Sequence, residues 1–496
     1  MYQKKVTVLF VPLFLSIVLL VLIFSLAACG GGGADPADTS ADANAGMETT
    51  NPKADANDPD VADINFQGYV FTILTTDDAL HNYPLHTRDV YAAEETGDPM
   101  NDATYRRNRE AEEKFNITIK MAAEPEPGGP YDALQKAVNA GDDIYDLFLA
   151  YEMGGSGPAA ANGFLLNWKK VPCVDFSKPY WSSEVAEQLS VGDKMFLALS
   201  DISVSSNEYL YAVFFNKQVH KEYGVENLYE TVKNKKWTID KAAEVSKGMT
   251  ADLNGDGRMG EEDMWGIIMN YGAQGLFYSC GNMVMRKDAK NIPYIDYVTD
   301  RSTASFDKAF GLCRSDYTIY DANWTREDRY FKIFAESRAL LMFKYLTAPQ
   351  ILRGMETDFG ILPYPKLDDA QENYYSFMDG HTLLMGVPKT ASDLDRTGAV
   401  IEETSYLSYL YLVPAYYDVS LKTKYSRDNE SGEMLDIIYG GRIFDFGYVY
   451  DNWIISYTFQ TQIDANSREF VSVVEKNIGK AQQNLDKVIA AYAAAE

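Results

Sequence analysis

Short apolar runs alternate with amphipathic stretches through the first part of the folded chain. Strands separated by helices predict a largely parallel sheet with helices on its faces. The predicted strands are GYVFTILTTDD (Gly68–Asp78), ITIKM (Ile117–Met121) and YDLFLA (Tyr145–Ala150), and the predicted helices between them are NDATYRRNREAEEKFN and YDALQKAVNAGD. Ligands of such sheets bind beyond the carboxyl ends of the strands. This rule directs attention to AYEMGGSG (Ala150–Gly157), whose glycines let a ligand approach the backbone closely.

The last part of the chain shows the spacing of an amphipathic helix. Its apolar positions are Phe470, Val473, Val474, Ile478, Ala481, Leu485, Val488, Ile489 and Tyr492. We expect this stripe to pack on the core.

The first residues have the pattern of a secretory signal. Lys4 and Lys5 precede an apolar run over 6–26, which ends in LAAC at Cys29. This ending resembles the lipobox of bacterial lipoproteins, which implies cleavage after residues 1–28 and lipidation of Cys29. An uncleaved transmembrane helix is the alternative, because about 20 apolar residues can span a bilayer. Both interpretations place the folded part on the outer face of the bacterial cytoplasmic membrane.

Residues 29–63 are rich in Gly, Ala, Asp, Asn, Thr and Pro and have few large apolar side chains. They cannot bury enough surface to offset their conformational entropy, so we interpret them as a flexible tether. The whole chain has 496 residues with 46% hydrophobic and 24% charged residues, which predicts a folded protein of two domains or lobes. The net charge of −27 argues against a nucleic-acid partner.

Three cysteines remain besides Cys29, and no CxxC motif occurs. A Cys280–Cys313 disulfide stays open as an alternative. We favour three buried free thiols, Cys173 included, because an odd number cannot pair completely.

The stretch DLNGDGRMGEED (residues 252–263) matches the ligand pattern of an EF-hand calcium loop. The predicted ligands are Asp252, Asn254, Asp256, the backbone carbonyl of Arg258, and Asp263 in place of the usual glutamate. Gly257 supplies the sharp turn. The alternative is an Asx-rich turn that binds nothing. A sensor pairs two such loops, so we predict a single structural Ca²⁺ that clips a helix to a strand.

No pattern in the chain nominates a catalytic centre. The four histidines form no metal-binding motif, and neither a nucleophile elbow nor a phosphate-binding loop is present. Carboxylate pairs of the glycosidase kind cannot be identified among 72 acidic residues. We therefore predict a protein that is not an enzyme, with a cell-surface glycoside hydrolase as an alternative.

Several segments together resemble the extracellular solute-binding proteins of carbohydrate ABC transporters, family 1. They include VFFNKQVHKEYGVENLYETVKNKKWTIDKAAEVSKGMTADLNGDG (213–257), the segment from ALLMFKYLTAPQIL to METDFGILPYPK (339–366), LLMGVPKTA (383–391) and YSRDNESGEMLDII (425–438). The resemblance covers nearly all of the chain after the tether. It implies an α/β fold of the periplasmic-binding-protein type, with two lobes and a ligand cleft between them.

The resemblance also implies the course of the chain. Lobe 1 would comprise residues 64–210 and 376–425, and lobe 2 would comprise 211–375 and 426–496. The crossings between the lobes are expected near 207–212, near 374–380 and around Tyr425.

A sugar ligand needs aromatic rings for its C–H faces and carboxylates or amides for its hydroxyl groups. The chain has 35 Tyr, 24 Phe and 6 Trp, most of which must be core or surface residues. Position relative to the predicted strand ends and crossings selects a smaller set. The candidate ligand-binding residues are Tyr151, Glu152, Asp201, Asn207, Tyr209, Tyr278, Tyr345, Asp379, Tyr450, Asp451 and Trp453.

The sequence thus predicts a lipid-anchored substrate-binding protein of an ABC importer, a monomer that captures a sugar or oligosaccharide and delivers it to permease subunits. A second alternative with the same fold is a sensory partner that presents its solute to a membrane kinase.

Overall fold

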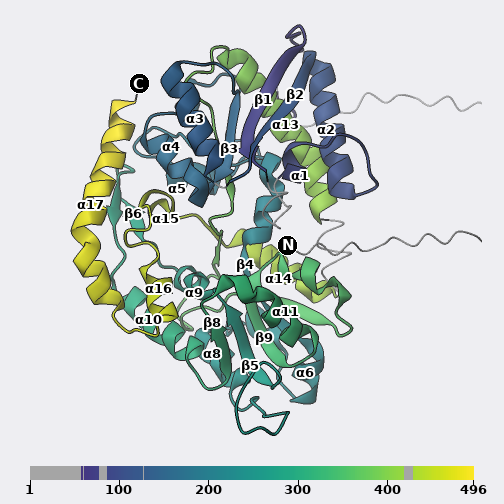
Figure 1. Cartoon of the computed structure of the whole chain (residues 1–496), viewed down its shortest axis with the longest axis vertical. Coiled ribbons are helices and arrows are strands. Elements are labelled where there is room, and N and C mark those ends of the chain that lie inside the picture. Colours follow the sequence, from purple (N-terminus) through teal and green to yellow (C-terminus); the bar gives the residue numbers. More distant parts are fainter. Residues whose placement is uncertain (1–56, 60, 78–86, 127, 418–427, 496) are drawn as a thin grey trace, which may run out of the picture. The chain divides into compact units, whose positions relative to one another are not determined.

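The computed structural model describes residues 57–59, 61–77, 87–126, 128–417 and 428–495 (Figure 1). Its first sheet has the strand order β12-β3-β1-β2. The strands are β1 (Tyr69–Thr76), β2 (Ile117–Glu124), β3 (Leu147–Tyr151) and β12 (Leu383–Gly386). β1 is parallel to β2 and β3, which confirms the predicted parallel arrangement. β12, from much later in the chain, pairs antiparallel with β3.

Both faces of this sheet are buried, as strand β3 shows. Leu147, Leu149 and Tyr151 belong to one apolar cluster, and Phe148 and Ala150 belong to another. Successive side chains of a strand point to opposite faces, so an unbroken apolar run indicates a strand covered on both sides. β3 therefore ends, at Tyr151, inside the molecule rather than at its surface.

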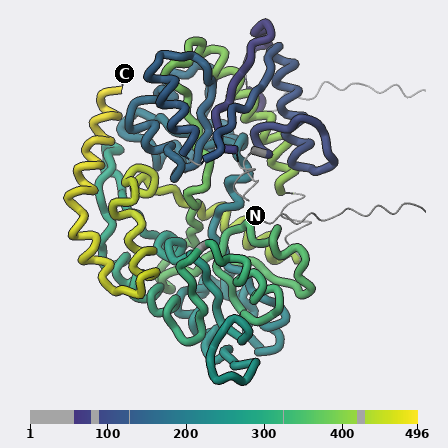
Figure 2. The backbone as a smooth tube through the Cα atoms, viewed as in Figure 1, coloured from purple at the N-terminus to yellow at the C-terminus, as the bar shows by residue number. Residues whose placement is uncertain are grey.

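Helices cover this sheet. α2 (Pro99–Phe115) begins where Asp98 accepts hydrogen bonds from the backbone N–H groups of Met100 (3.0 Å) and Asn101 (3.1 Å), which is an N-cap. The long helix α13 (Leu394–Ala415) packs along α2, so that segments distant in sequence lie side by side (Figure 2). The remaining helical elements of this part are α1 (Thr87–Val90), α3 (Gly129–Ala140), α4 (Gly157–Ala161), α5 (Ser183–Leu189), η2 (Glu152–Ser156), η3 (Trp168–Lys170) and η4 (Asp201–Tyr209).

The second sheet has the order β10-β4-β9-β5-β8. Its strands are β4 (Tyr211–Asn216), β5 (Trp265–Asn270), β8 (Thr318–Asp321), β9 (Ala339–Tyr345) and β10 (Phe359–Pro363). β4 is antiparallel to both neighbours, whereas β5 is parallel to β8 and β9. Its helical elements are α6 (Lys217–Glu222), α7 (Leu228–Lys233), α8 (Ile239–Ser246), α9 (Ala273–Ser279), α10 (Asp300–Cys313), η5 (Trp324–Arg326), α11 (Glu327–Ala335), α12 (Ala348–Ile351) and η6 (Leu352–Gly354).

Two chain segments connect the sheets, and they lie side by side. The first runs from η4 into β4, and the second runs through β11 (Ser376–Phe377) to β12. Leu210 forms a β-bridge with Met378, and the N–H of Asp379 donates to the carbonyl oxygen of Tyr209 at 3.2 Å. The crossing expected around Tyr425 lies outside the described residues.

The C-terminal part adds helices that pack on both regions. They are α14 (Asn429–Gly440), α15 (Phe446–Tyr450), α16 (Thr458–Asp464) and α17 (Phe470–Ala494). Two small strand pairs complete the fold: β11 pairs with β13 (Arg442–Ile443), and β6 (Met285–Lys287) pairs with β7 (Pro293–Ile295). The predicted stripe of α17 is mostly buried, but Ile478 is 39% exposed. A Cβ added at the neighbouring Gly479 would meet nothing within 4 Å, so the helix surface at these two positions faces open space.

The described cysteines are free thiols, so no Cys280–Cys313 disulfide forms. Cys280 and Cys313 are buried, as predicted. The prediction of a buried Cys173 is wrong, because this residue lies exposed in a turn with a φ of 65°.

Within the described residues, no helix combines the length and the apolar character needed to cross a membrane. The predicted signal peptide (1–28), Cys29 and most of the tether lie outside these residues.

Candidate functional site

The two connecting segments bring a carboxylate, an imidazole and two phenols together. The Asp379 carboxylate accepts hydrogen bonds from the Tyr211 hydroxyl (3.3 Å) and from the backbone N–H of His381 (3.3 Å), and it also contacts Nδ1 of His381. The Tyr209 ring stacks on His381, with ring centroids 4.9 Å apart and an interplanar angle of 15°. Asp379 is thus held in place from both segments, while His381 remains partly exposed.

Glu152 joins this group from the end of β3. Its backbone N–H donates to the carbonyl oxygen of Thr382 (3.1 Å), and the next N–H, of Met153, donates to Gly380 (3.2 Å). The ring of the preceding Tyr151 is nearly perpendicular to that of His381, with centroids 5.9 Å apart. The strand end at which a ligand was expected therefore lies directly on the second connecting segment.

The Glu152 side chain is only 5% exposed, and its Oε1 atom has no hydrogen-bond partner among the described residues. Burial raises the pKa of this carboxyl well above its ordinary value, and the charges of Asp379 and Asp445 raise it further. Buried polar atoms are usually satisfied, so the Oε1 atom of Glu152 lacks the hydrogen bond that normally compensates burial.

Aromatic side chains of the second sheet region and of the C-terminal part lie near Asp379. Tyr345, at the end of β9, lies 6.0 Å from Tyr209 and 4.7 Å from Tyr211 by ring centroids. Burial raises the pKa of the phenols of Tyr345, Tyr448, Tyr457 and Tyr271, the last to about 12, and in each case the charge of Asp379 contributes. All four hydroxyl groups therefore lie within electrostatic reach of this carboxylate. We use the name aromatic–carboxylate cluster for these four tyrosines together with seven further residues. The seven are Glu152, Tyr151, Tyr209, Tyr211, Asp379, His381 and Trp453.

Trp453 forms the exposed end of this cluster. It is 53% exposed and its ring lies 5.7 Å from that of Tyr457. Asn452 and Trp453 both have positive φ values, 53° and 59°, which is rare for a bulky side chain. The buried Asp451 fixes this turn, because its Oδ2 accepts hydrogen bonds from the N–H groups of Ile455 (2.6 Å) and Ser456 (2.9 Å).

Four other predicted residues are not members of the cluster, although the ring of Tyr278 lies 6.4 Å from that of its member Tyr448. Tyr278 is fully buried, stacks on Phe377 at 3.9 Å and donates its hydroxyl to Asp445 (2.9 Å). Tyr450 is buried against Phe446, at 4.3 Å, and bonds the Tyr492 hydroxyl.

Asn207 and Asp201 lie beside a basic side chain instead. Nη1 of Arg442 donates to Oδ1 of Asn207 at 3.2 Å. Burial raises the pKa of Asp201 to about 7, against the opposing charge of Arg442. Asp201 and Asn207 thus lie beside a guanidinium group, whereas the cluster consists mainly of carboxylates and aromatic rings.

Sequence reasoning did not select His381, Tyr211, Tyr271, Tyr448 or Tyr457. His381 follows Asp379 by two residues in the predicted second crossing, and this proximity is a usable signal. The tyrosines carry no such signal, because their positions depend on packing between distant segments.

The loop at 252–263 lies between α8 and β5, as predicted. Its side-chain oxygens accept hydrogen bonds from its own backbone: Asp252 from Gly255 and Gly257, and Asp263 from Leu253 and Gly260. The N–H groups of Gly260, Leu253 and Asn254 hold the pKa of Asp263 below its ordinary value. Ionised carboxylates with free lone pairs suit Ca²⁺. Within the described residues, however, no three His, Cys, Asp or Glu side chains converge as a ready metal site.

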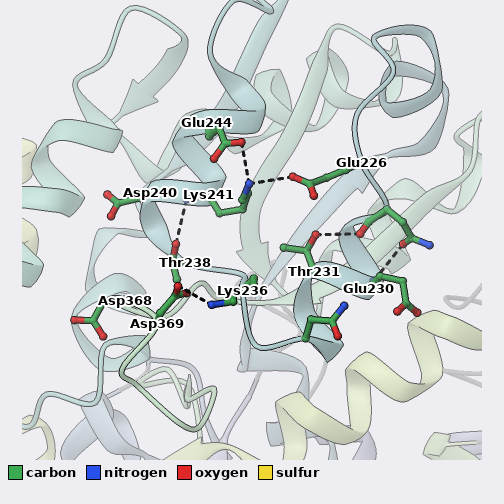
Figure 3. Close-up of a pocket in the computed structure, with 12 residues that line it drawn as sticks. Glu226, Glu230, Thr231, Lys236, Thr238, Asp240, Lys241, Glu244, Asp368 and Asp369 are labelled. Atoms are coloured by element: carbon green, nitrogen blue, oxygen red, sulfur yellow. Dashed lines mark hydrogen bonds and ion pairs between the residues drawn. The ribbon is translucent and has the colours of Figure 1, made fainter.

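A surface hollow of about 670 Å³ lies between α7, α8 and the 368–369 turn (Figure 3). Its two lysines are paired: Lys241 with Glu226 (3.1 Å) and Glu244 (2.8 Å), and Lys236 with Asp369 (2.7 Å). No aromatic ring lines it. The hollow therefore lacks the aromatic rings and the unsatisfied polar group that the aromatic–carboxylate cluster has.

No protein-family model matches the chain, and no curated protein is similar to it in sequence. Solved structures resemble it in fold. A cyclo/maltodextrin-binding protein complexed with maltotetraose has a TM-score of 0.54 and 12% identity, over 86% of this chain and 97% of that one. An ABC substrate-binding protein from Listeria monocytogenes, in complex with cycloalternan, has a TM-score of 0.52 and 11% identity, over 85% and 99%.

A family 1 extracellular solute-binding protein from Bifidobacterium longum subsp. infantis has a TM-score of 0.51 and 12% identity, over 86% of this chain and 99% of that one. These three are binding proteins, not enzymes. At this identity the likeness establishes the fold: the chain has the two-lobed α/β fold of periplasmic-type binding proteins.

Proposed function

We propose that the protein captures a sugar or oligosaccharide in the aromatic–carboxylate cluster and delivers it to the permease subunits of an ABC importer. The observation that carries the proposal is the meeting of flat rings and carboxylates where the two connecting segments lie side by side. Aromatic faces match the C–H faces of sugars, and the carboxylates accept hydrogen bonds from their hydroxyl groups. The fold, shared with carbohydrate-binding proteins, supports this proposal.

In this proposal each group has a separate task. Trp453 and Tyr457 offer an exposed pair of rings for the outer part of the ligand. Asp379, oriented by Tyr211 and His381, accepts hydrogen bonds from ligand hydroxyl groups deeper in the cluster. Binding favours a closed arrangement of the lobes only to the extent that the ligand binds that arrangement more tightly.

The sequence LAAC at Cys29 supports a lipid anchor on the outer face of the membrane. Two or more acyl chains, each contributing about 0.8 kcal/mol per buried methylene, hold a protein there stably. We further propose that the protein acts as a monomer. The 252–263 loop would hold one structural Ca²⁺ through Asp252, Asn254, Asp256, Asp263 and the Arg258 carbonyl.

The test is a thermal-shift screen of the purified protein with neutral and amino sugars, followed by calorimetry of the ligands that stabilise it. We expect at least one saccharide to raise the melting temperature and to bind without being consumed. Release of shorter sugars during incubation would support the glycoside hydrolase instead. If no saccharide shifts the melting curve, the sugar proposal fails.

A further inference from the structure

The aromatic–carboxylate cluster has an excess of negative charge around one buried side chain. Burial, Asp379 and Asp445 are the influences on the Glu152 carboxyl within the described structure, and all of them act against its ionisation. No hydrogen-bond donor reaches its Oε1 atom in the same residues. Glu152 is 95% buried, so bulk water does little to stabilise a negative charge on its carboxylate.

Its two acidic neighbours are satisfied, in contrast. Asp379 accepts from Tyr211 and His381. Asp445 accepts from the N–H groups of Val284 (2.6 Å) and Gly447 (2.8 Å) and from the hydroxyl of Tyr278. Glu152 is therefore the member of this acidic group that lacks a donor.

Three basic side chains on the elements that form or adjoin the site are engaged elsewhere. Lys344 lies 4.8 Å from the centre of the Tyr345 ring, but its ammonium pairs with Glu327 at 2.8 Å. Arg442 donates to Asn207 and lies 3.8 Å from Glu184. His381 contacts Asp379. A positive partner for Glu152 must therefore come from outside the described chain.

We propose that the ligand is an amine-bearing saccharide, whose ammonium group binds Glu152 beside Asp379. This inference rests on the proposed sugar-binding function and specifies its ligand class. An ammonium group brings three donors and the opposite charge, so it satisfies Oε1 and lets Glu152 ionise where it is buried. The faces of the surrounding tyrosines also attract cations. A neutral hydroxyl group supplies a donor but no charge, and a uronic acid adds a further negative charge.

The experiment compares ligands that differ only at the amino group. Calorimetry at pH 7 would use glucosamine and its β-1,4-linked oligomers against the N-acetylated forms of equal length, with spermidine as an amine that carries no sugar. We expect the free-amine saccharide to bind at least about tenfold more tightly than its acetylated form, and spermidine to bind weakly or not at all. Ionisation of Glu152 should also release a proton, which makes the heat depend on the ionisation enthalpy of the buffer.

Glu152→Gln keeps the shape of the side chain and removes its charge. It should weaken binding of the amine by roughly 30-fold, the scale of losing one partner of a buried charge pair, and should abolish the proton release. Binding of the acetylated sugar should change little. Glu475→Gln, an exposed position on α17, is the matched control and should behave as the unaltered protein does.

The outcomes separate the two proposals. Tighter binding of the acetylated or neutral sugar would overturn the amine assignment and leave sugar capture intact. Spermidine binding without any saccharide binding would overturn both. If Glu152→Gln fails to fold, the ligand comparison and the proton release of the unaltered protein still decide the question.

Discussion

At the scale of single residues, Trp453 combines exposure with an unusual backbone. Bulky residues adopt positive φ rarely, and such conformations persist where the surroundings fix them, often at functional sites. Asp451 provides this fixation through two backbone N–H groups. The backbone that carries the Trp453 ring is thus fixed, and under the proposed function this would reduce the entropy that binding must overcome.

Trp453→Ala should therefore weaken saccharide binding by about 1–3 kcal/mol, as expected for a central aromatic contact, without lowering thermal stability much. Calorimetry measures the affinity and circular dichroism the melting temperature. Tyr223→Ala removes a similarly exposed ring directly after the end of α6 and serves as control. Equal affinities of the two variants would remove Trp453 from the site.

Asp201 gives a second prediction at this scale, for pH. Its folded-state pKa is about 7, whereas an unfolded aspartate titrates near 3.9, so the folded state keeps the proton longer. Stability should therefore fall as pH rises from about 4 to about 7. Asp201→Asn should stabilise the protein at pH 8, by roughly 1–4 kcal/mol, and should have no such effect at pH 4.

Urea unfolding at both pH values measures this difference. Asp193→Asn, at an exposed turn, should show none. A stabilisation of equal size at both pH values would mean that the effect comes from packing and not from protonation.

At the scale of elements, the local pattern predicted β1, β2, β3, α2, α3 and α17. Their signals are short range: apolar runs for strands, a helical stripe, and turn residues between them. The position of β12 at the edge of the first sheet has no local signal, since it depends on pairing with β3 from far away in the chain. The wide helical turn at Glu152–Ser156 was not predicted either.

The 252–263 loop is the element whose role remains a prediction. If the loop binds Ca²⁺, a saturating concentration of Ca²⁺ should raise the melting temperature. At a Ca²⁺ concentration of a hundred times Kd, the free energy of unfolding should rise by about 2.7 kcal/mol. A chelator should reverse this gain. Asp256→Ala should remove the response, whereas Asp316→Ala, at another exposed turn, should keep it. Identical melting curves with and without Ca²⁺ would favour a bare turn.

At the scale of the whole molecule, sequence reasoning could propose two lobes but not the contents of the site. Tyr151, Glu152, Tyr209, Tyr345, Asp379 and Trp453 lie in or beside one cluster, because the connecting segments and strand ends converge there. Tyr278 and Tyr450 lie in packed interiors. A tyrosine suits a core and a sugar site equally well, so only long-range packing separates the two.

The proposed anchor belongs to this scale, because it determines where the molecule works. Cys29→Ser should move the protein from the membrane fraction to the medium or leave it unprocessed, and should abolish labelling by a radioactive fatty acid. Cys173→Ser changes another exposed cysteine and should label normally. Normal labelling of the Cys29→Ser protein would contradict the lipobox assignment.

The backbone hydrogen bond from the N–H of Asp379 to the carbonyl oxygen of Tyr209 places Asp379, the carboxylate proposed to bind the ligand, on the two connecting segments, about which a bending of the lobes would occur. Points on a rotation axis hardly travel, whereas points far from it sweep long arcs. A ligand bound first by Asp379 would therefore move little during closure of the lobes, whereas Trp453, farther from the hinge, would move toward it.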